Sequence, residues 1–188
     1  MRTILATALL LAFFAAPASA ADYVLDKPHT QAQFTVVHLG FSKVNGLIPL
    51  ISGTMTVGPN NLPTAATATF DVTNLETYDA NRNASLRDRY FEADKYPTIT
   101  FVERKITGTP ENFVMTGDLT IHGVTKSVVL KVDLLGFGPG MMGAQLSGWD
   151  ATTTIDRTDF GVNGPAMLGK ALGNEVAITI SIEADLKK

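Results

Sequence analysis

Hydrophobic and polar side chains alternate along most of the chain beyond residue 30, and this alternation restricts the fold more than any other sequence feature. Successive side chains of a β-strand point to opposite faces, so a strand with one buried face shows a period of two. The number and spacing of the segments with this alternation predict an all-β chain of about eight antiparallel strands. These strands are either closed into a single barrel or stacked as a sandwich. The segments with this pattern are residues 30–38, 44–57, 65–75, 98–101, 113–121, 128–134, 149–155 and 176–182.

Two glycine-containing segments interrupt the alternation of hydrophobic and polar residues. His122-Gly123 lies between two alternating runs and predicts a tight two-residue hairpin turn. Residues 138–143 fit the G-x-G-x-x-G pattern of dinucleotide sites. That motif needs a helix to begin at the glycines, so that backbone amides face the pyrophosphate, whereas a strand pattern follows here. We therefore interpret residues 138–143 as a long hairpin loop.

One segment breaks the strand pattern. Residues 82–94 are expected to form the only helix, because apolar residues there recur at helical spacing. Asp79 or Asn81 can cap its start, and Pro97 forbids its continuation.

The first twenty residues have the composition of an export signal. A positively charged start, an apolar run and a small-x-small ending at Ala20 predict a secretory signal peptide, cleaved to leave residues 21–188 as one domain. The apolar run is shorter than the about 20 residues that a membrane span needs. We expect a bacterial periplasm as the destination. Because the chain has no cysteine, a disulfide framework, a thiol nucleophile and a lipid anchor are excluded.

Charge and residue spacing argue against several classes of function. The formal net charge is −3 and no long basic run occurs, so we expect no nucleic-acid partner. His29, His38 and His122 share no metal-ligand spacing, so no metal site is expected. No nucleophile–base pair stands out, and we expect no catalytic residues. The enzymatic alternative, acting on a lipid or its head group, would use His38 or Asp159 as acid and base.

The apolar faces combine large aromatic residues with many alanines and glycines. An eight-stranded barrel has an interior that side chains fill or that holds one small ligand. Small inward residues can leave such a lumen open, or they can serve close packing of two sheets in a sandwich without a ligand. Composition alone leaves these two alternatives open.

Five motifs in order resemble the YceI-like, polyisoprenoid-binding family, over nearly all of the chain after the signal. The first two lie in residues 29–40 and 44–53, with His29-Thr30 at the start and Val44-x-Gly46 in the second. The third runs from Phe91 through residues 95–101 (KYPTITF). The fourth, residues 117–125 (GDLTIHGVT), is similar to the most distinctive hairpin of the family, and the fifth spans residues 155–162.

The resemblance implies an elongated, lipocalin-like antiparallel barrel that holds a long amphiphile in an apolar tunnel. Such a ligand is a polyisoprenoid, an isoprenoid quinone or a fatty-acid derivative, and no other cofactor is expected. We expect a non-enzymatic periplasmic carrier or scavenger, and exposed strand edges permit a homodimer. The expected ligand-binding residues, with His38 and Arg82 near the mouth, are Phe34, Val36, His38, Phe41, Phe70, Val72, Arg82, Phe91, Ile99, Phe101, Leu119, Ile121, Trp149 and Phe160.

The chain departs from the family pattern at three positions. Asn83 and Ser85 stand where the family tends to have a carboxylate and an imidazole, and Ile48 replaces a usual aromatic residue. If the helix meets the polar head of the ligand, head-group preference differs from that of relatives. Ile48 is expected to widen the tunnel slightly.

Overall fold

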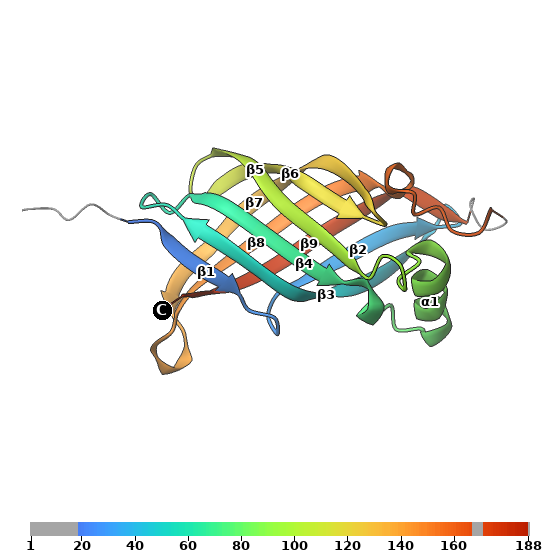
Figure 1. The fold of residues 1–188 in the computed structure, drawn as a ribbon, viewed down its shortest axis with the longest axis horizontal. Coiled ribbons are helices and arrows are strands. Elements are labelled where there is room, and N and C mark those ends of the chain that lie inside the picture. Colours follow the sequence, from blue (N-terminus) through green and yellow to red (C-terminus); the bar gives the residue numbers. More distant parts are fainter. Residues whose placement is uncertain (1–18, 167–170, 188) are drawn as a thin grey trace, which may run out of the picture.

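The computed structural model describes residues 19–166 and 171–187, and its strands wind into an elongated barrel (Figure 1). Most of the expected signal peptide therefore lies outside the described residues. The strands are β1 (Ala21–Leu25), β2 (Gln31–His38), β3 (Ser42–Val57), β4 (Pro63–Asp71), β5 (Thr98–Gly108), β6 (Asn112–Ile121), β7 (Val124–Pro139), β8 (Gln145–Asp156) and β9 (Leu172–Leu186).

The barrel closes through eight strand positions, and every pairing is antiparallel. Around the ring the order is β3-β2-β9-β8-β7-β6-β5-β4, and β4 pairs again with β3. The predicted all-β antiparallel barrel is thus confirmed, and the sandwich alternative is wrong. Because each described strand pairs on both sides, the exposed edges that favoured a homodimer are not found among them.

The short strand β1 and the strand β2 share one position in the ring. Both strands pair with β3 on one side and with β9 on the other. On β3, β1 pairs near the end of the strand (Val24 with Thr54), and β2 pairs with its earlier residues (Gln31 with Pro49). A turn over residues 26–30 separates them. Pro28 lies in this turn, where its missing N–H costs no ladder hydrogen bond. The sequence analysis did not predict β1, since five residues are too few to establish a period of two.

Helical segments gather at one end of the barrel, and the β7–β8 hairpin projects at the other (Figure 1). At the helical end lie η1 (Val72–Asn74), α1 (Ala80–Ser85), the π-helical turn η2 (Leu86–Tyr90) and η4 (Arg157–Phe160). Asp79 caps α1 by accepting a hydrogen bond from the backbone N–H of Arg82, as predicted. The helix predicted over residues 82–94 ends earlier, because Glu92 adopts a left-handed φ of 46°.

The two glycine segments form hairpins. Ile121 pairs with Val124, so His122 and Gly123 are a two-residue turn, and both have positive φ, as a type I′ turn requires. At residues 138–143 the chain passes from β7 through the short turn η3 (Met141–Gly143) into β8. The only helical element at these glycines, within the described residues, is the three-residue 3-10 turn η3, and it leads into β8 instead of an α-helix, so the geometry that a dinucleotide site needs is missing.

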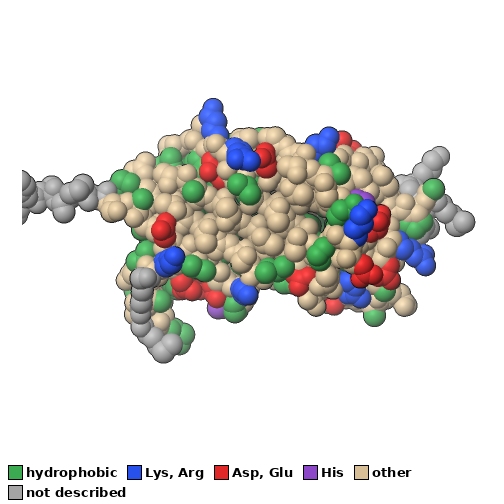
Figure 2. Space-filling model, viewed as in Figure 1, with side chains coloured by type: hydrophobic (Ala, Val, Ile, Leu, Met, Phe, Trp, Pro, Cys, Tyr) green, Lys and Arg blue, Asp and Glu red, His purple; other side chains and the backbone are tan. Residues whose placement is uncertain are grey.

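The surface carries scattered charges of both signs. On the face in Figure 2, acidic and basic side chains are interspersed, with no continuous basic area. Within the described ranges, no helix has both the length and the apolar character to cross a bilayer.

Candidate ligand-binding site

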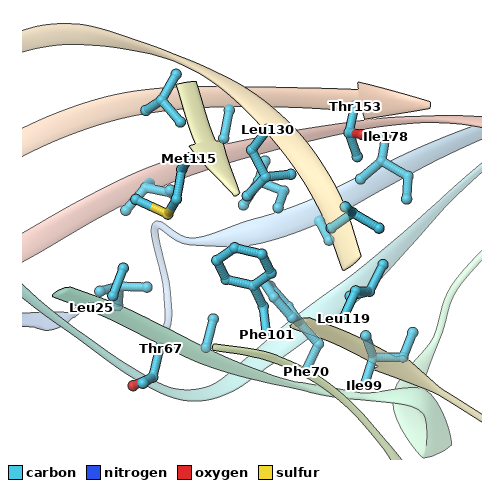
Figure 3. A pocket seen from close by; sticks show the side chains of 18 of the residues that line it. Leu25, Thr67, Phe70, Ile99, Phe101, Met115, Leu119, Leu130, Thr153 and Ile178 are labelled. Carbon is cyan, nitrogen blue, oxygen red and sulfur yellow. The ribbon is translucent and has the colours of Figure 1, made fainter. Parts of the chain in front are cut away.

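An apolar cavity occupies the barrel interior (Figure 3), with a volume of about 120 Å³. One water molecule needs only about 10–15 Å³ on this scale, so the cavity far exceeds a packing gap. Its lining comes from all nine strands and, among the described residues, includes no Lys, Arg, His, Asp or Glu. The interior therefore suits a neutral, apolar ligand and disfavours a charged one.

Small side chains on the inward faces keep this space open. Ala32, Ala66, Ala68 and Ala151 line the cavity from β2, β4 and β8. An alanine side chain extends no farther than its Cβ, so the lumen in front of it is filled only if a neighbour reaches across. The open lumen, rather than close sheet packing, is therefore the consequence of the small residues.

A second apolar cavity, of about 90 Å³, lies at the helical end of the barrel. Leu86 and Tyr90 from η2 and Phe160 from η4 close this end. The two cavities share five lining residues and therefore lie end to end, from the barrel centre to the helical end. The shared residues are Phe34, Ile48, Ile99, Ile121 and Ile178.

Arg157 is the only charged residue that lines either cavity in the described part of the chain. Its guanidinium donates to the backbone carbonyls of Val162, Leu172, Asn163 and Gly173, and to Asn174 Oδ1, at 2.6 to 3.4 Å. A guanidinium has five N–H groups, and these bonds use all of them. Four backbone carbonyls and one side-chain amide oxygen around the β8–β9 connection therefore take up its donors.

Most of the expected ligand-binding residues line these cavities. Phe34, Ile99 and Ile121 line both. The remainder divide between the larger cavity (Phe70, Phe101, Leu119, Trp149) and the smaller one (Val36, Phe91, Phe160).

Four expected residues lie away from the lining. His38 is the last residue of β2, where Ser42 Oγ lies 3.5 Å from its Nδ1, and Phe41, in the β2–β3 turn, is 84% exposed. Val72 is buried in η1, outside both cavities. Arg82 donates from Nη2 to the carbonyl of Thr77 at 2.6 Å and from Nε to its hydroxyl. The period-two rule gives no direction for side chains in turns and helices such as Phe41, Val72 and Arg82. At His38 the register between β2 and β9 shifts, which interrupts the alternation.

Several lining residues were not singled out from the sequence. Leu25 comes from the unpredicted strand β1, and Tyr90 from the π-helical turn. Met115 and Leu130 lie on predicted inward faces, so the alternation itself was a sufficient signal for them.

Asn83, one of the departures from the family pattern, organises the loop before α1. It is 6% exposed, its Oδ1 accepts from the backbone N–H and hydroxyl of Thr77 at 2.8 and 2.6 Å, and its Nδ2 donates to Glu76 Oε1 at 2.8 Å. This last bond, together with one from the backbone N–H of Tyr78, lowers the pKa of Glu76. Asn83 is in neither lining, so its contacts concern the loop and not the cavity.

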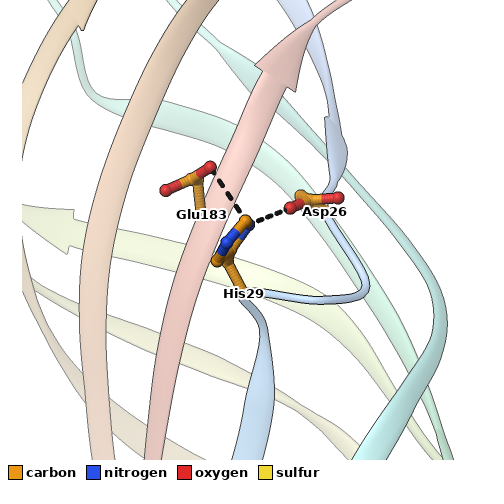
Figure 4. Close-up of side chains that lie close together, drawn as sticks. All are labelled: Asp26, His29 and Glu183. Carbon is orange, nitrogen blue, oxygen red and sulfur yellow. Dashed lines mark hydrogen bonds and ion pairs between the residues drawn. The ribbon is translucent and has the colours of Figure 1, made fainter. Parts of the chain in front are cut away.

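A polar cluster bridges the break between β1 and β2 (Figure 4). His29 Nδ1 forms a hydrogen bond with Asp26 and lies 3.5 Å from Glu183 Oε1 on β9. The bond to Asp26, followed by the charge of Glu183, raises the pKa of His29. Next to it, the buried Thr30 hydroxyl pairs with the backbone of Glu183 at 3.1 Å in both directions. The cluster thus fastens the turn to β9.

Two buried polar atoms lie at the hairpin end of the barrel. Trp149 and Ser147 share the inward face of β8 and are 0% and 1% exposed. Among the described residues, neither Trp149 Nε1 nor Ser147 Oγ has a hydrogen-bond partner. Leaving such a group unpaired costs about 1–3 kcal/mol, so most buried donors have a partner.

A closed antiparallel barrel around a neutral, apolar cavity is the architecture of proteins that bind one hydrophobic ligand. The profile of the YceI-like domain matches residues 23–184, and this chain belongs to that family. Protein YceI of Escherichia coli O17:K52:H18 is 35% identical over 186 residues, covering 95% of this chain and 94% of that protein.

Two solved structures have the same fold. BcnA of Burkholderia cenocepacia superposes with a TM-score of 0.73 at 21% identity, covering 85% of this chain and 98% of BcnA. A polyisoprenoid binding domain from Saccharophagus degradans superposes with a TM-score of 0.65 at 13% identity, covering 88% of this chain and 98% of that domain.

Proposed function

We propose that this protein is a non-enzymatic periplasmic carrier or scavenger of a long-chain amphiphilic lipid, such as a polyisoprenoid, an isoprenoid quinone or a fatty-acid derivative. The observation that carries the proposal is the pair of apolar cavities that lie end to end and share five lining residues. Two cavities in this arrangement fit a slender chain. The name of the Saccharophagus degradans domain, which has the same fold, agrees with such a ligand.

Hydrophobic burial supplies enough free energy for this role. Burying about ten methylene groups contributes roughly 8 kcal/mol, at about 0.8 kcal/mol each. Ordering the ligand and losing its translational freedom cost several kcal/mol. The remainder corresponds to dissociation constants near the micromolar range, without a cofactor or a charged anchor.

The residues proposed to contact the hydrocarbon chain of the ligand are those expected ligand-binding residues that line the cavities. Phe34, Ile99 and Ile121 line both cavities, and Phe101 and Trp149 line the larger one. His38, Phe41, Val72 and Arg82 are not part of this proposal.

A matched pair of variants on β4 tests the proposal. Ala68 lines the cavity and Ala65 points outward on the same strand, so Ala68→Phe fills the lumen and Ala65→Phe does not. We expect wild-type protein and Ala65→Phe, gently purified from cells, to carry a long-chain lipid in native mass spectrometry. Ala68→Phe should carry at least about tenfold less, because the buried contact area is lost. Wild-type protein that is always empty and takes up no fatty-acid or quinone analogue refutes the proposal.

The proposed location has its own test. Export with cleavage after Ala20 predicts a mature protein that begins at Ala21 and occurs in the periplasmic fraction. N-terminal sequencing of the fractionated protein checks this. An uncleaved amino terminus in the cytoplasmic fraction would contradict it.

A further inference from the structure

The β7–β8 hairpin continues past the end of the barrel, and the chain around its tip has no polar side chain (Figure 1). Residues 134–144 (LLGFGPGMMGA) include no charged, hydroxyl or amide side chain. Among them, Met141 is 90% exposed, Leu135 66% and Phe137 38%. Surface turns are ordinarily polar, and a run of exposed apolar residues of this length is a liability unless it has a binding role.

The base of this hairpin is fixed to the barrel. The pairing of β7 with β6 ends at Asp133, so from there on β8 is the only partner of β7 among the described strands. The ring of Phe137 packs edge-to-face on Trp149 at 5.5 Å, and Tyr23 of β1 packs against Phe137 at 6.2 Å. The hairpin is therefore held in one direction, at the end of the barrel opposite the helices (Figure 1).

The backbone of the hairpin tip pairs with itself. The N–H of Gly140 donates to the carbonyl of Ala144 at 2.7 Å. Pro139, which pairs with Gln145 at the end of the ladder, has no N–H that needs an acceptor. An apolar medium penalises backbone groups without a partner, so this internal pairing suits a tip that leaves water.

The size and the apolar character of the hairpin favour a lipid surface over a second copy of the chain. A stable protein interface takes roughly 20–30 residues from each side, far more than this narrow ribbon provides. Because no position from 134 to 144 is polar, both faces of the ribbon and its tip are apolar. A protein partner covers one face of such a ribbon, whereas hydrocarbon surrounds it on every side.

Charges near the base of the hairpin define which lipid surface fits. Residues 132–156 contain no Lys or Arg, so the hairpin offers no cation to an anionic head group. Asp133 pairs with Asp150 across the base, and Asp185 pairs with Leu146 on the other side of β8. These carboxylates stay in water and limit the depth of insertion.

We infer that the β7–β8 hairpin inserts into the interfacial region of a lipid bilayer, and that this insertion needs no anionic lipid. Apolar elements of this kind enter a bilayer by about 5–10 Å. The inference goes beyond the proposed function and does not rest on it. It supplies a membrane contact through which a lipid carrier would stay near the source of its ligand.

Co-sedimentation with vesicles tests the inference on protein purified from cells. We expect wild-type protein to sediment with phosphatidylcholine vesicles, which carry no net charge, equally well at low and at high salt. Met141→Asp should reduce the bound fraction at least about tenfold, because a carboxylate at the tip resists leaving water. Val129→Asp is the matched control, since Val129 is 52% exposed on the same strand but lies in the barrel wall, paired with Thr116.

A fluorescent label measures insertion of the tip directly. The chain has no cysteine, so Met141→Cys and Val129→Cys each provide a single attachment site for the environment-sensitive fluorophore NBD. We expect phosphatidylcholine vesicles to increase the emission at position 141 several-fold and to shift it to the blue. Emission at position 129 should stay nearly unchanged.

Several outcomes would overturn the inference. These are wild-type protein that stays in the supernatant, equal loss of binding in the two aspartate variants, and equal fluorescence changes at positions 141 and 129. Binding that requires phosphatidylglycerol and disappears at high salt would be electrostatic. A dimer that Met141→Asp dissociates, without vesicle binding, would assign the hairpin to a second copy. Lipid cargo is measured separately by native mass spectrometry, so the inference and the proposed function can fail independently.

Discussion

The ring of Phe101 on β5 lies directly over Gly117 on β6, in the space that a Cβ at position 117 would occupy. The carbonyl oxygen of Val102 lies 2.6 Å from the same point. Because Gly117 has no side chain, the phenyl ring of Phe101 rests against the barrel wall. The larger cavity stays open beside the ring.

Gly117→Ala should therefore narrow the lumen. The added methyl group cannot displace the β5 backbone at Val102, so it pushes the Phe101 ring inward. Overpacking of this kind costs about 1–3 kcal/mol of unfolding free energy. We expect lower stability in urea denaturation and weaker uptake of methyl hexadecanoate. Gly138→Ala is the control, since its Cβ meets nothing within 4 Å. Equal behaviour of the two variants would contradict this account of the open lumen.

Asn83→Asp places a carboxylate at this buried position and should destabilise this chain. The carboxylate can still accept the two bonds from Thr77, but it cannot donate to Glu76, and the two negative charges repel. We expect a loss of about 1–3 kcal/mol at pH 7, measured by chemical denaturation. Asn81→Asp, the same change at an exposed position of α1, should have little effect or stabilise slightly.

The stability difference between wild type and Asn83→Asp should also depend on pH. The pKa of Glu76 is lowered in the wild type, so its contribution is present above the unfolded pKa near 4.5 and is lost as pH falls through the folded pKa. The difference should consequently shrink in acid. A difference that stays constant from pH 7 down to pH values well below 4.5 would argue against the Asn83–Glu76 bond.

His29 should stabilise the protein at acidic and neutral pH and cease to do so in alkaline solution. Its pKa is raised above the ordinary value of 6.5 by the hydrogen bond to Asp26 and the charge of Glu183. A raised pKa means that the stabilisation is complete below the unfolded pKa and disappears as pH rises through the folded pKa. Melting temperatures of wild type and His29→Gln should therefore differ most near pH 6 and converge toward pH 9. If the two melting temperatures instead moved apart as pH rises, the pKa of His29 would not be raised by folding.

Arg157→Lys should be far more damaging than Arg104→Lys, although the two changes are chemically identical. Arg157 is buried and donates to four carbonyls and Asn174, and lysine can satisfy at most three of these acceptors. We expect a loss of about 2–4 kcal/mol in denaturant melts. Arg104 pairs with Asp118 on an exposed surface, where a loss below about 1 kcal/mol is expected. Similar losses would mean that the β8–β9 connection does not depend on Arg157.

Strict alternation was a reliable guide where it extended over many residues. Along β7, for example, Val128, Leu130 and Val132 were predicted to share one face, and all three line the cavity. The end of the helix was not predictable in the same way, because the positive φ of Glu92 has no signature in the local pattern. Phe41 was expected among the ligand-binding residues, but it belongs to an exposed turn.

The sequence by itself determined which side chains share the apolar face in most of the longer strands, because side chains alternate between the two faces of a strand and the apolar set marks the buried one. Only the tertiary structure decided that β3 pairs with β4 to close the ring, that β1 and β2 share one position, and that the cavities meet at Phe34 and Ile99. The physical reason is that pairing and closure depend on backbone hydrogen bonds between segments far apart in the chain. The unfilled volume, in turn, depends on how side chains from all nine strands pack together.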